Sequence, residues 1–323
     1  MERLSDILLT SEVAITLFID IFLFILLSLA FYQSVLLLKN YNFNATDATQ
    51  YQLEKKSYFV ITIISISIII KFILLPFFVH TLDVLSGIVP GAMCGAGVIG
   101  ANEFGKVALF VKILIVLLSM LWFRLNSHDE KTKNQPYFRM KLFFFVFIYM
   151  LIVLEIILEL KFFTNISTES PVLCCSVIYT DVTDINQLPL NLSMRQLLYT
   201  FYGLYLFILV LNYYKKRCIL ALVSLLFSYI SYYVIVYFFG TYIYELPTHK
   251  CPFCMLQSDY NFIGYAIFFS LFLATFYALS AALFGFRKND FKTSSLFYTL
   301  FILLCSWSFV VYILNNSTLL APL

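Results

Sequence analysis

The sequence predicts an all-α, polytopic integral membrane protein with about eight transmembrane helices. Of its 323 residues, 62% are hydrophobic, 19% are aromatic and only 12% are charged. Mean hydropathy is +0.90, whereas soluble domains carry about 25% charged residues. Roughly 20 apolar residues cross a bilayer as a helix. Stretches of this kind lie at 13–38, 58–80, 105–125, 142–160, 197–213, 218–239, 260–285 and 296–314.

Two segments need a separate judgement. The stretch 13–38 is flanked by Asp6 and Glu12 and is followed by no A-x-A site, so we interpret it as a retained helix and not as a cleaved signal. The segment 84–102 is uncharged, and six of the ten glycines fall between Gly87 and Gly105. We interpret it as a re-entrant or surface-lying segment buried in protein, not as a ninth span.

Basic residues define the expected orientation. The loops after the first, third, fifth and seventh stretches hold 14 lysines and arginines, and the opposite side holds 5. Basic residues of short loops stay in the cytoplasm, so both termini are expected outside. The pI near 8.3 then reflects topology and indicates no nucleic-acid partner. The partner that the composition indicates is the lipid bilayer of a cell membrane, and we expect a bacterial inner membrane.

The halves of the chain differ in their chemistry. Residues 1–162 contain the first four stretches, the glycine-rich outer loop and all the charged residues within the apolar stretches. Residues 163–323 contain the other four stretches and two cysteine-bearing outer loops. We therefore divide the chain at this point.

Cysteines in the outer loops are the main candidate site. The loop residues are Cys94, Cys174, Cys175, Cys251 and Cys254. Cys218 and Cys305 fall within apolar stretches and are expected to pack as small apolar residues.

Cys251-Pro-Phe-Cys254 is the sharpest motif. Two thiols at this spacing can form a small redox ring, and a helix N-terminus stabilises a thiolate. We expect the motif to lie at the start of the helix predicted at 260–285. This position resembles the membrane thiol oxidases of the disulfide bond B and vitamin K epoxide reductase families, in which a CxxC lies at the outer end of a spanning helix.

The resemblance implies roles for four cysteines. Cys251 and Cys254 match the helix-end pair that passes electrons to a quinone. Cys174 and Cys175 would be the pair that exchanges with a soluble periplasmic thiol protein. Their adjacency departs from those families, whose loop cysteines are separated and which have fewer spanning helices.

Soft-metal binding is the alternative chemistry. Thiolate, thioether and imidazole groups select Cu(I) or Zn(II), and the site would serve metal transfer, transport or maturation of an external metalloenzyme. The candidate ligands are Cys94, Cys174, Cys175, Cys251, Cys254, His80, His249, Met93 and Met255. A third interpretation is that the cysteines form structural disulfides that stabilise the outer loops.

The histidines and tyrosines of the sequence bear on two possible cofactors, haem and quinone. The three histidines, His80, His128 and His249, all fall outside the predicted helices, which excludes a buried bis-histidine haem. Tyrosines of the stretches 197–213 and 218–239 offer a surface for a quinone ring, although aromatic belts also account for membrane tyrosines.

Charged residues inside the membrane form a second candidate site. They are Asp20, Lys71, Lys112, Glu155 and Glu159. Such residues are costly in lipid and often functional, although internal ion pairs that fix helix packing explain them equally well. We expect Asp20 to pair with Lys71 and Lys112 with Glu155, and we expect Glu159 to be interfacial because Lys161 is close to it.

Overall fold

The computed structural model describes residues 7–42, 47–132, 135–168, 170–172, 192–247, 249–285, 287, 289–316 and 319–320. Cys174 and Cys175, the expected exchange pair, lie outside these residues. Every regular element in the described part of the chain is a helix. The all-α prediction is therefore confirmed.

Among the residues that the structure describes, eight helices are long and apolar enough to cross a membrane. They are α2 (Ser11–Asn40), α3 (Ala48–Ser86), α5 (Glu103–Asp129), α6 (Phe138–Thr164), α8 (Met194–Tyr214), the continuous run Arg217–Tyr244, α11 (Ile263–Leu283) and α12 (Asn289–Asn316). The run Arg217–Tyr244 consists of α9 (Arg217–Val234), the π-helix η3 (Ile235–Phe239) and α10 (Gly240–Tyr244). Each of the eight overlaps one predicted stretch, and the chain is thus a polytopic α-helical membrane protein.

The helices extend beyond the apolar stretches. The clearest case is α3, which has 39 residues and begins ten residues before the stretch predicted at 58–80. Its first turns include Glu54, Lys55 and Lys56, which are good helix formers but not apolar. Hydropathy locates the part of a helix that fits in the bilayer, whereas the backbone hydrogen bonds continue past it.

The segment 84–102 does not form a long helix. α3 ends at Ser86, turns follow, and α4 (Gly95–Ile99) is a buried helix of five residues. Five residues rise only about 7–8 Å, too short to cross a bilayer. The prediction that this segment is not a ninth span agrees with this geometry.

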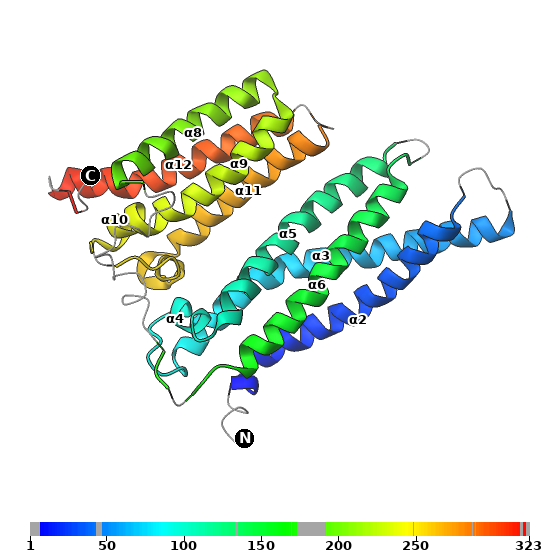
Figure 1. Ribbon diagram of the computed structural model, residues 1–323, viewed down its shortest axis with the longest axis horizontal. Helices are drawn as coiled ribbons and strands as arrows, with labels where there is room; N and C mark the ends of the chain where they lie inside the picture. The colour runs from blue at the N-terminus through cyan, green and yellow to red at the C-terminus, as the bar shows by residue number, and fades with distance from the viewer. Residues whose placement is uncertain are drawn as a thin grey trace. The chain divides into compact units, whose positions relative to one another are not determined.

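The chain divides into two compact units, Met1–Val172 and Leu173–Leu323. In unit 1, α2 packs on α3, α3 on α5, α5 on α6, and α6 on α2. The four long helices thus close into a bundle, with α4 against α3 and α5 (Figure 1). In unit 2, α8, α9, α11 and α12 close in the same way.

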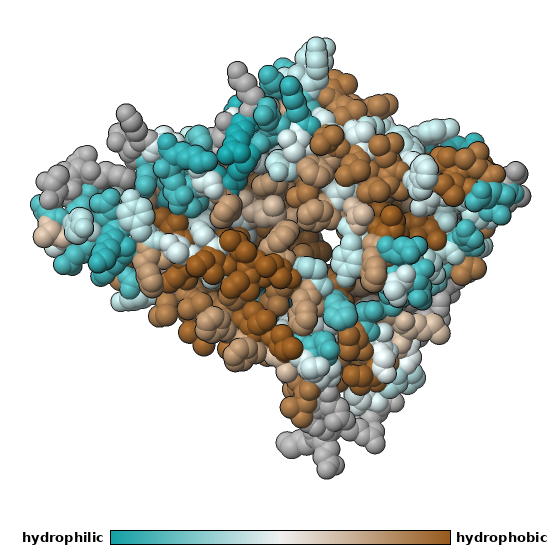
Figure 2. Space-filling model, turned by 180° about the vertical axis from the view of Figure 1, so that it is seen from behind, coloured by the Kyte–Doolittle hydropathy of each residue, from teal (hydrophilic) through white to brown (hydrophobic). Residues whose placement is uncertain are grey.

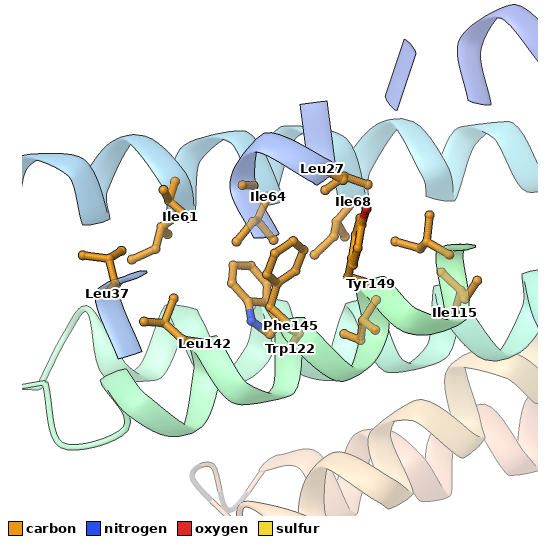
Figure 3. Close-up of a cluster of buried hydrophobic side chains, with 14 of the residues drawn as sticks. Leu27, Leu37, Ile61, Ile64, Ile68, Ile115, Trp122, Leu142, Phe145 and Tyr149 are labelled. Atoms are coloured by element: carbon orange, nitrogen blue, oxygen red, sulfur yellow. The ribbon is translucent and has the colours of Figure 1, made fainter. Parts of the chain in front are cut away.

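A hydrophobic core fills the bundle of unit 1. Leu27 of α2, Ile64 of α3, Trp122 of α5 and Phe145 of α6 point toward one another between the four helices (Figure 3). Trp122 is fully buried, and its indole N–H donates to the Lys141 carbonyl at 2.8 Å. The only polar atom of this large side chain is therefore satisfied.

Unit 2 has an aromatic core. The Phe201 ring on α8 lies 5.3 Å from that of Phe227 on α9, 5.8 Å from Phe239 and 6.0 Å from Phe301 on α12. All four side chains are fully buried. Packing among these rings joins α8, α9, η3 and α12.

The outer surface is apolar, as a lipid-facing surface must be. Large hydrophobic side chains such as Phe18, Phe110, Leu222 and Leu303 are more than 60% exposed. Figure 2 shows broad hydrophobic areas on one face of the molecule. Such exposure in water would cause aggregation, whereas in a bilayer it is the expected state.

Gly105, in the first turn of α5, offers a test of the packing in unit 1. A Cβ added there would clash with the Ile99 carbonyl and come within 2.7 Å of the Phe162 ring. We expect Gly105→Ala to lower the free energy of unfolding by about 1–3 kcal/mol. Gly203→Ala is the matched control, because a Cβ at Gly203 meets no atom within 4 Å. Thermal unfolding of the purified variants in detergent measures both, and equal stability of the two would contradict this packing.

Candidate functional site

Cys251 and Cys254 lie in the connection between α10 and α11. Their sulfur atoms are within 4.8 Å of each other. Both side chains are buried, with 2% and 7% of their surface exposed. A disulfide has a sulfur separation of about 2 Å, so the two sulfur atoms must move closer together to form one.

Tyr244 holds this loop in place. Its hydroxyl donates to the Cys251 carbonyl and accepts from the Met255 N–H, the latter at 3.0 Å. Tyr244 is the last residue of α10, so one side chain connects both sides of the CxxC motif to the preceding helix. The His249 ring packs edge-on against Tyr244, with centroids 4.4 Å apart.

The expected helix-start position of the motif is wrong. Cys254 begins η4, a 3₁₀ turn over Cys254–Leu256, and η5 (Ser258–Tyr260) follows. α11 begins only at Ile263, nine residues after Cys254. The helix dipole acts within about the first turn of a helix, so α11 does not activate these thiols.

The motif nevertheless packs closely against α11. A Cβ at Gly264 would lie 2.8 Å from Leu256 and would clash with Met255. Glycine at this position allows η4 to contact the first turn of α11. The cysteine loop is therefore clamped between Tyr244 and Gly264.

The other predicted metal ligands are distributed between the units. Met255 is fully buried beside the pair, and His249 contacts Tyr244. His80, Met93 and Cys94 belong to unit 1. There, Cys94 is the buried residue that precedes α4, whereas Met93 is 76% exposed.

A row of tyrosines runs along α9 and η3 toward the cysteine loop. The rings of Tyr229 and Tyr233 are 5.1 Å apart, and those of Tyr233 and Tyr237 stack at 6.2 Å. The Lys250 ammonium lies 5.4 Å from the Tyr237 ring centroid. Burial lowers the pKa of Lys250, so this lysine gives up its proton more readily than a free lysine does. The row thus ends at the residue before Cys251.

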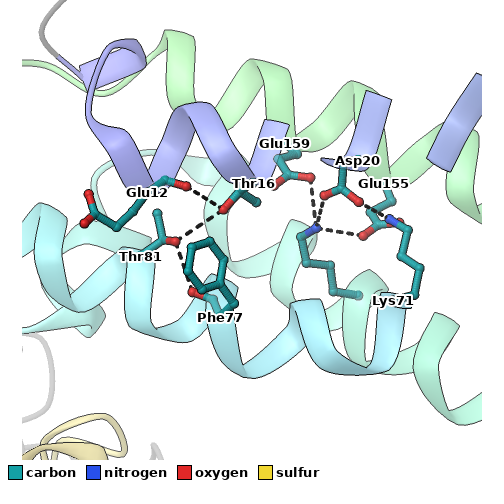
Figure 4. Close-up of polar contacts among 9 residues, drawn as sticks. Glu12, Thr16, Asp20, Lys71, Phe77, Thr81, Glu155 and Glu159 are labelled. Atoms are coloured by element: carbon teal, nitrogen blue, oxygen red, sulfur yellow. Dashed lines mark hydrogen bonds and ion pairs between the residues drawn. The ribbon is translucent and has the colours of Figure 1, made fainter. Parts of the chain in front are cut away.

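In unit 1 the charged residues form one buried cluster. The Lys71 ammonium contacts Asp20 and, at 2.8 Å, Glu155. The Lys112 ammonium contacts Asp20 at 3.0 Å, Glu155 at 2.8 Å and Glu159 at 2.9 Å. Figure 4 shows Asp20, Lys71, Glu155 and Glu159 converging on one another. Together with Lys112 on α5, the cluster draws on all four long helices of the bundle. Both expected pairs are present, joined in a single network.

The expected interfacial position of Glu159 is wrong. Its side chain is 1% exposed and points to Lys112 on the neighbouring helix. Lys161, its close neighbour in sequence, lies instead over the Phe104 ring at 5.3 Å. Two residues differ by about 200° around a helix, so the two side chains take different faces.

A second buried ion pair was missed from the sequence. Lys141 and Asp129 are both fully buried and lie 2.9 Å apart. Asp129 also accepts from the Tyr137 N–H at 2.8 Å. Lys141 precedes the predicted stretch 142–160, so its place in the sequence is that of a loop charge. Only the helical start at Phe138 reveals that it faces the bundle.

The predicted loop positions of His80 and His128 are wrong. His80 lies inside α3 and His128 inside α5, not in loops. Both are near the C-terminal ends of their helices, and consecutive helices of the bundle run in opposite directions. These two histidines therefore lie toward opposite ends of the bundle, so they cannot bind one haem together.

Comparisons with protein-family models, with curated proteins and with solved structures found no match to this chain. The class of the protein follows from its own helices, and the cysteine pair and the buried charged cluster are its two candidate sites.

Tyr244→Phe tests the clamp on the cysteine loop. The substitution removes the hydroxyl that hydrogen-bonds the Cys251 carbonyl and the Met255 N–H. We therefore expect the free energy of unfolding to fall by about 1–3 kcal/mol. Tyr199→Phe is the control, because Tyr199 is 72% exposed. Differential scanning fluorimetry of both variants measures the effect, and unchanged stability of Tyr244→Phe would argue against the clamp.

Proposed function

We propose that this protein carries out thiol–disulfide exchange coupled to the membrane, with Cys251 and Cys254 as the redox pair. The observation that carries the proposal is the approach of the two sulfur atoms to within 4.8 Å in a clamped loop. A pair this close interconverts between dithiol and disulfide with little movement of the backbone.

The electron acceptor we propose is a membrane quinone. Oxidation of the two thiols forms one S–S bond and releases two protons and two electrons. Reduction of a quinone to a quinol consumes two electrons and two protons, so the reaction balances. A soluble partner protein on the outer face, in its reduced dithiol form, would then reduce the Cys251–Cys254 disulfide through a mixed disulfide and would itself become oxidised.

The tyrosine row supports a quinone approach from the bilayer. Tyr229 is 51% exposed and Tyr232 is 41% exposed, as lipid-facing residues are, while Tyr237 is buried next to Lys250. Flat aromatic rings favour stacking with a quinone ring. A quinone that follows this row arrives at the residue adjacent to Cys251.

Binding of a soft metal is the competing function for the same residues. Two sulfur atoms within 4.8 Å, with Met255 beside them, are a donor set that Cu(I) accepts. Metal binding and disulfide formation exclude each other, because both use the two thiolates.

One experiment separates the two functions. The reduced protein is purified in detergent, its copper and zinc content is measured, and its thiols are titrated before and after incubation with ubiquinone. The redox function predicts loss of one pair of thiols with equimolar quinol and no stoichiometric metal. Bound metal that is lost in Cys251→Ser, with thiols inert to quinone, would overturn it.

A further inference from the structure

The buried cluster of unit 1 carries unequal charges. Three carboxyl groups, of Asp20, Glu155 and Glu159, have oxygen atoms within 4.8 Å of one another. Two ammonium groups, of Lys71 and Lys112, lie among them. All five side chains are at most 5% exposed. With every group ionised, the cluster has one uncompensated negative charge in the membrane-spanning part of the bundle, which is costly.

Glu159 is where the excess charge falls. Glu155 accepts from both lysines, and Asp20 contacts both lysines as well. Glu159 contacts Lys112 through one oxygen only. Its other oxygen, Oε1, is fully buried and has no hydrogen-bond partner among the described residues. A buried carboxylate oxygen without a hydrogen-bond donor needs either a bound proton or a neighbouring cation.

A metal cation does not suit the position. The Lys112 ammonium already contacts all three carboxyl groups and the Lys71 ammonium contacts two, so positive charge fills the centre of the cluster. The cavity beside it measures about 10 Å³ and is lined by both lysines and Glu155. This volume is close to the space that one water molecule needs. A proton neutralises Glu159 without further space.

We propose that this cluster is a proton-binding site and that Glu159 carries the exchangeable proton. The groups nearest Glu159 are the Lys112 ammonium from α5 and the carboxyl groups of Asp20 from α2 and Glu155 from its own helix α6. Lys71 from α3 contacts both of these carboxyl groups. With the proton bound, two carboxylates balance two ammonium groups. Release of the proton leaves the cluster with one net negative charge. Binding and release of the proton therefore change the electrostatic interactions that join all four helices.

The site lies close to one end of helix α6. Glu159 is five residues from the end of α6, or about 8 Å along the helix axis. Intramembrane carboxyl groups that gain and lose protons are the working parts of proton relays. The site lies within unit 1 and does not involve the cysteine pair.

Infrared difference spectroscopy of the purified protein tests the proposal. A protonated carboxylic acid has a C=O stretching band that carboxylates lack, and the band shifts in D₂O. We expect this band in the wild type at neutral pH and its absence in Glu159→Gln. Glutamine has the shape of the protonated side chain, so this variant should fold. Asp290→Asn is the control, because Asp290 is also buried but lies in α12, and it should keep the band.

Isotope labelling gives the same answer without a substitution. Incorporation of ¹³C-glutamate should move the band, and ¹³C-aspartate should leave it in place. A band that moves with labelled aspartate, or that persists in Glu159→Gln, would overturn the assignment. Absence of the band from mildly acidic to mildly alkaline pH would overturn proton binding. A band that disappears when sodium replaces choline at constant pH would show that the site takes a metal cation instead.

Discussion

Lys112→Met is expected to destabilise unit 1 by about 3–5 kcal/mol, because it leaves buried charges without their partner. Lys112 contacts Asp20, Glu155 and Glu159, and no other residue of the cluster contacts all three acids. Its removal leaves Lys71 alone with three carboxyl groups. Thermal unfolding in detergent, followed by size-exclusion chromatography, should show a protein that is largely unfolded or aggregated where the wild type is monodisperse.

Two further variants separate charge from side-chain loss. Lys106→Met is the control in the same helix, because Lys106 is exposed, and it should behave as the wild type. The double variant Lys112→Met, Glu159→Gln removes one positive and one negative group and should recover part of the lost stability. Equal instability of the single and double variants would mean that Lys112 acts by packing and not by its charge.

Cys251→Ser is expected to abolish quinone reduction by this protein. In the proposed reaction, with dithiothreitol as the reductant, electrons pass through a Cys251–Cys254 disulfide to the quinone, and a lone thiol cannot form that disulfide. The rate of quinol formation should fall to the rate without protein. Cys254→Ser should have the same effect, since each thiol is one half of the pair.

Two other cysteines provide matched controls. Cys218 is exposed at the start of α9, and Cys305 is buried in α12. Cys218→Ser and Cys305→Ala should keep the wild-type rate. Quinone reduction that survives in Cys251→Ser, or that is lost equally in all four variants, would contradict the assignment of the redox pair.

The sequence allowed the helices to be predicted because their signal is local. A run such as 142–160 has too many apolar residues to be anything but a spanning helix, and α6 covers it. The ends of helices were less predictable, because polar helix formers such as Lys55 and Lys56 continue a helix without an apolar signal. The π-helix η3 likewise has no signature in the apolar pattern of the stretch 218–239.

The charged cluster was predictable in part. Asp20, Lys71, Lys112 and Glu155 stand out because an ionisable residue within an apolar stretch needs a partner. Glu159 and Lys141 lie near helix ends, where a charge can equally face water. Only the direction of each side chain, set by about 100° per residue around the helix, places them inside the bundle.

The cysteine site was predictable by motif but not by geometry. The spacing of Cys251 and Cys254 suggested a close pair, and the two sulfur atoms are close. The nine-residue separation between Cys254 and α11 was not evident, because residues 255–262 include tyrosine and phenylalanine that resemble the start of an apolar helix. The role of Tyr244 depends on a contact across seven residues, which no local pattern reveals.

The proposed function requires Cys251 and Cys254 to form a reversible disulfide with a quinone as oxidant. The most direct measurement uses a variant in which these are the only cysteines, with C94A, C174A, C175A, C218A and C305A. The reduced variant is incubated with ubiquinone in nanodiscs, and the peptide that contains the motif is weighed by mass spectrometry without reduction. The proposed function predicts that the peptide from the quinone-treated protein is lighter than the reduced peptide by two hydrogen atoms. Dithiothreitol should restore the mass of the reduced peptide. A peptide with both thiols intact and open to alkylation after quinone treatment would contradict it.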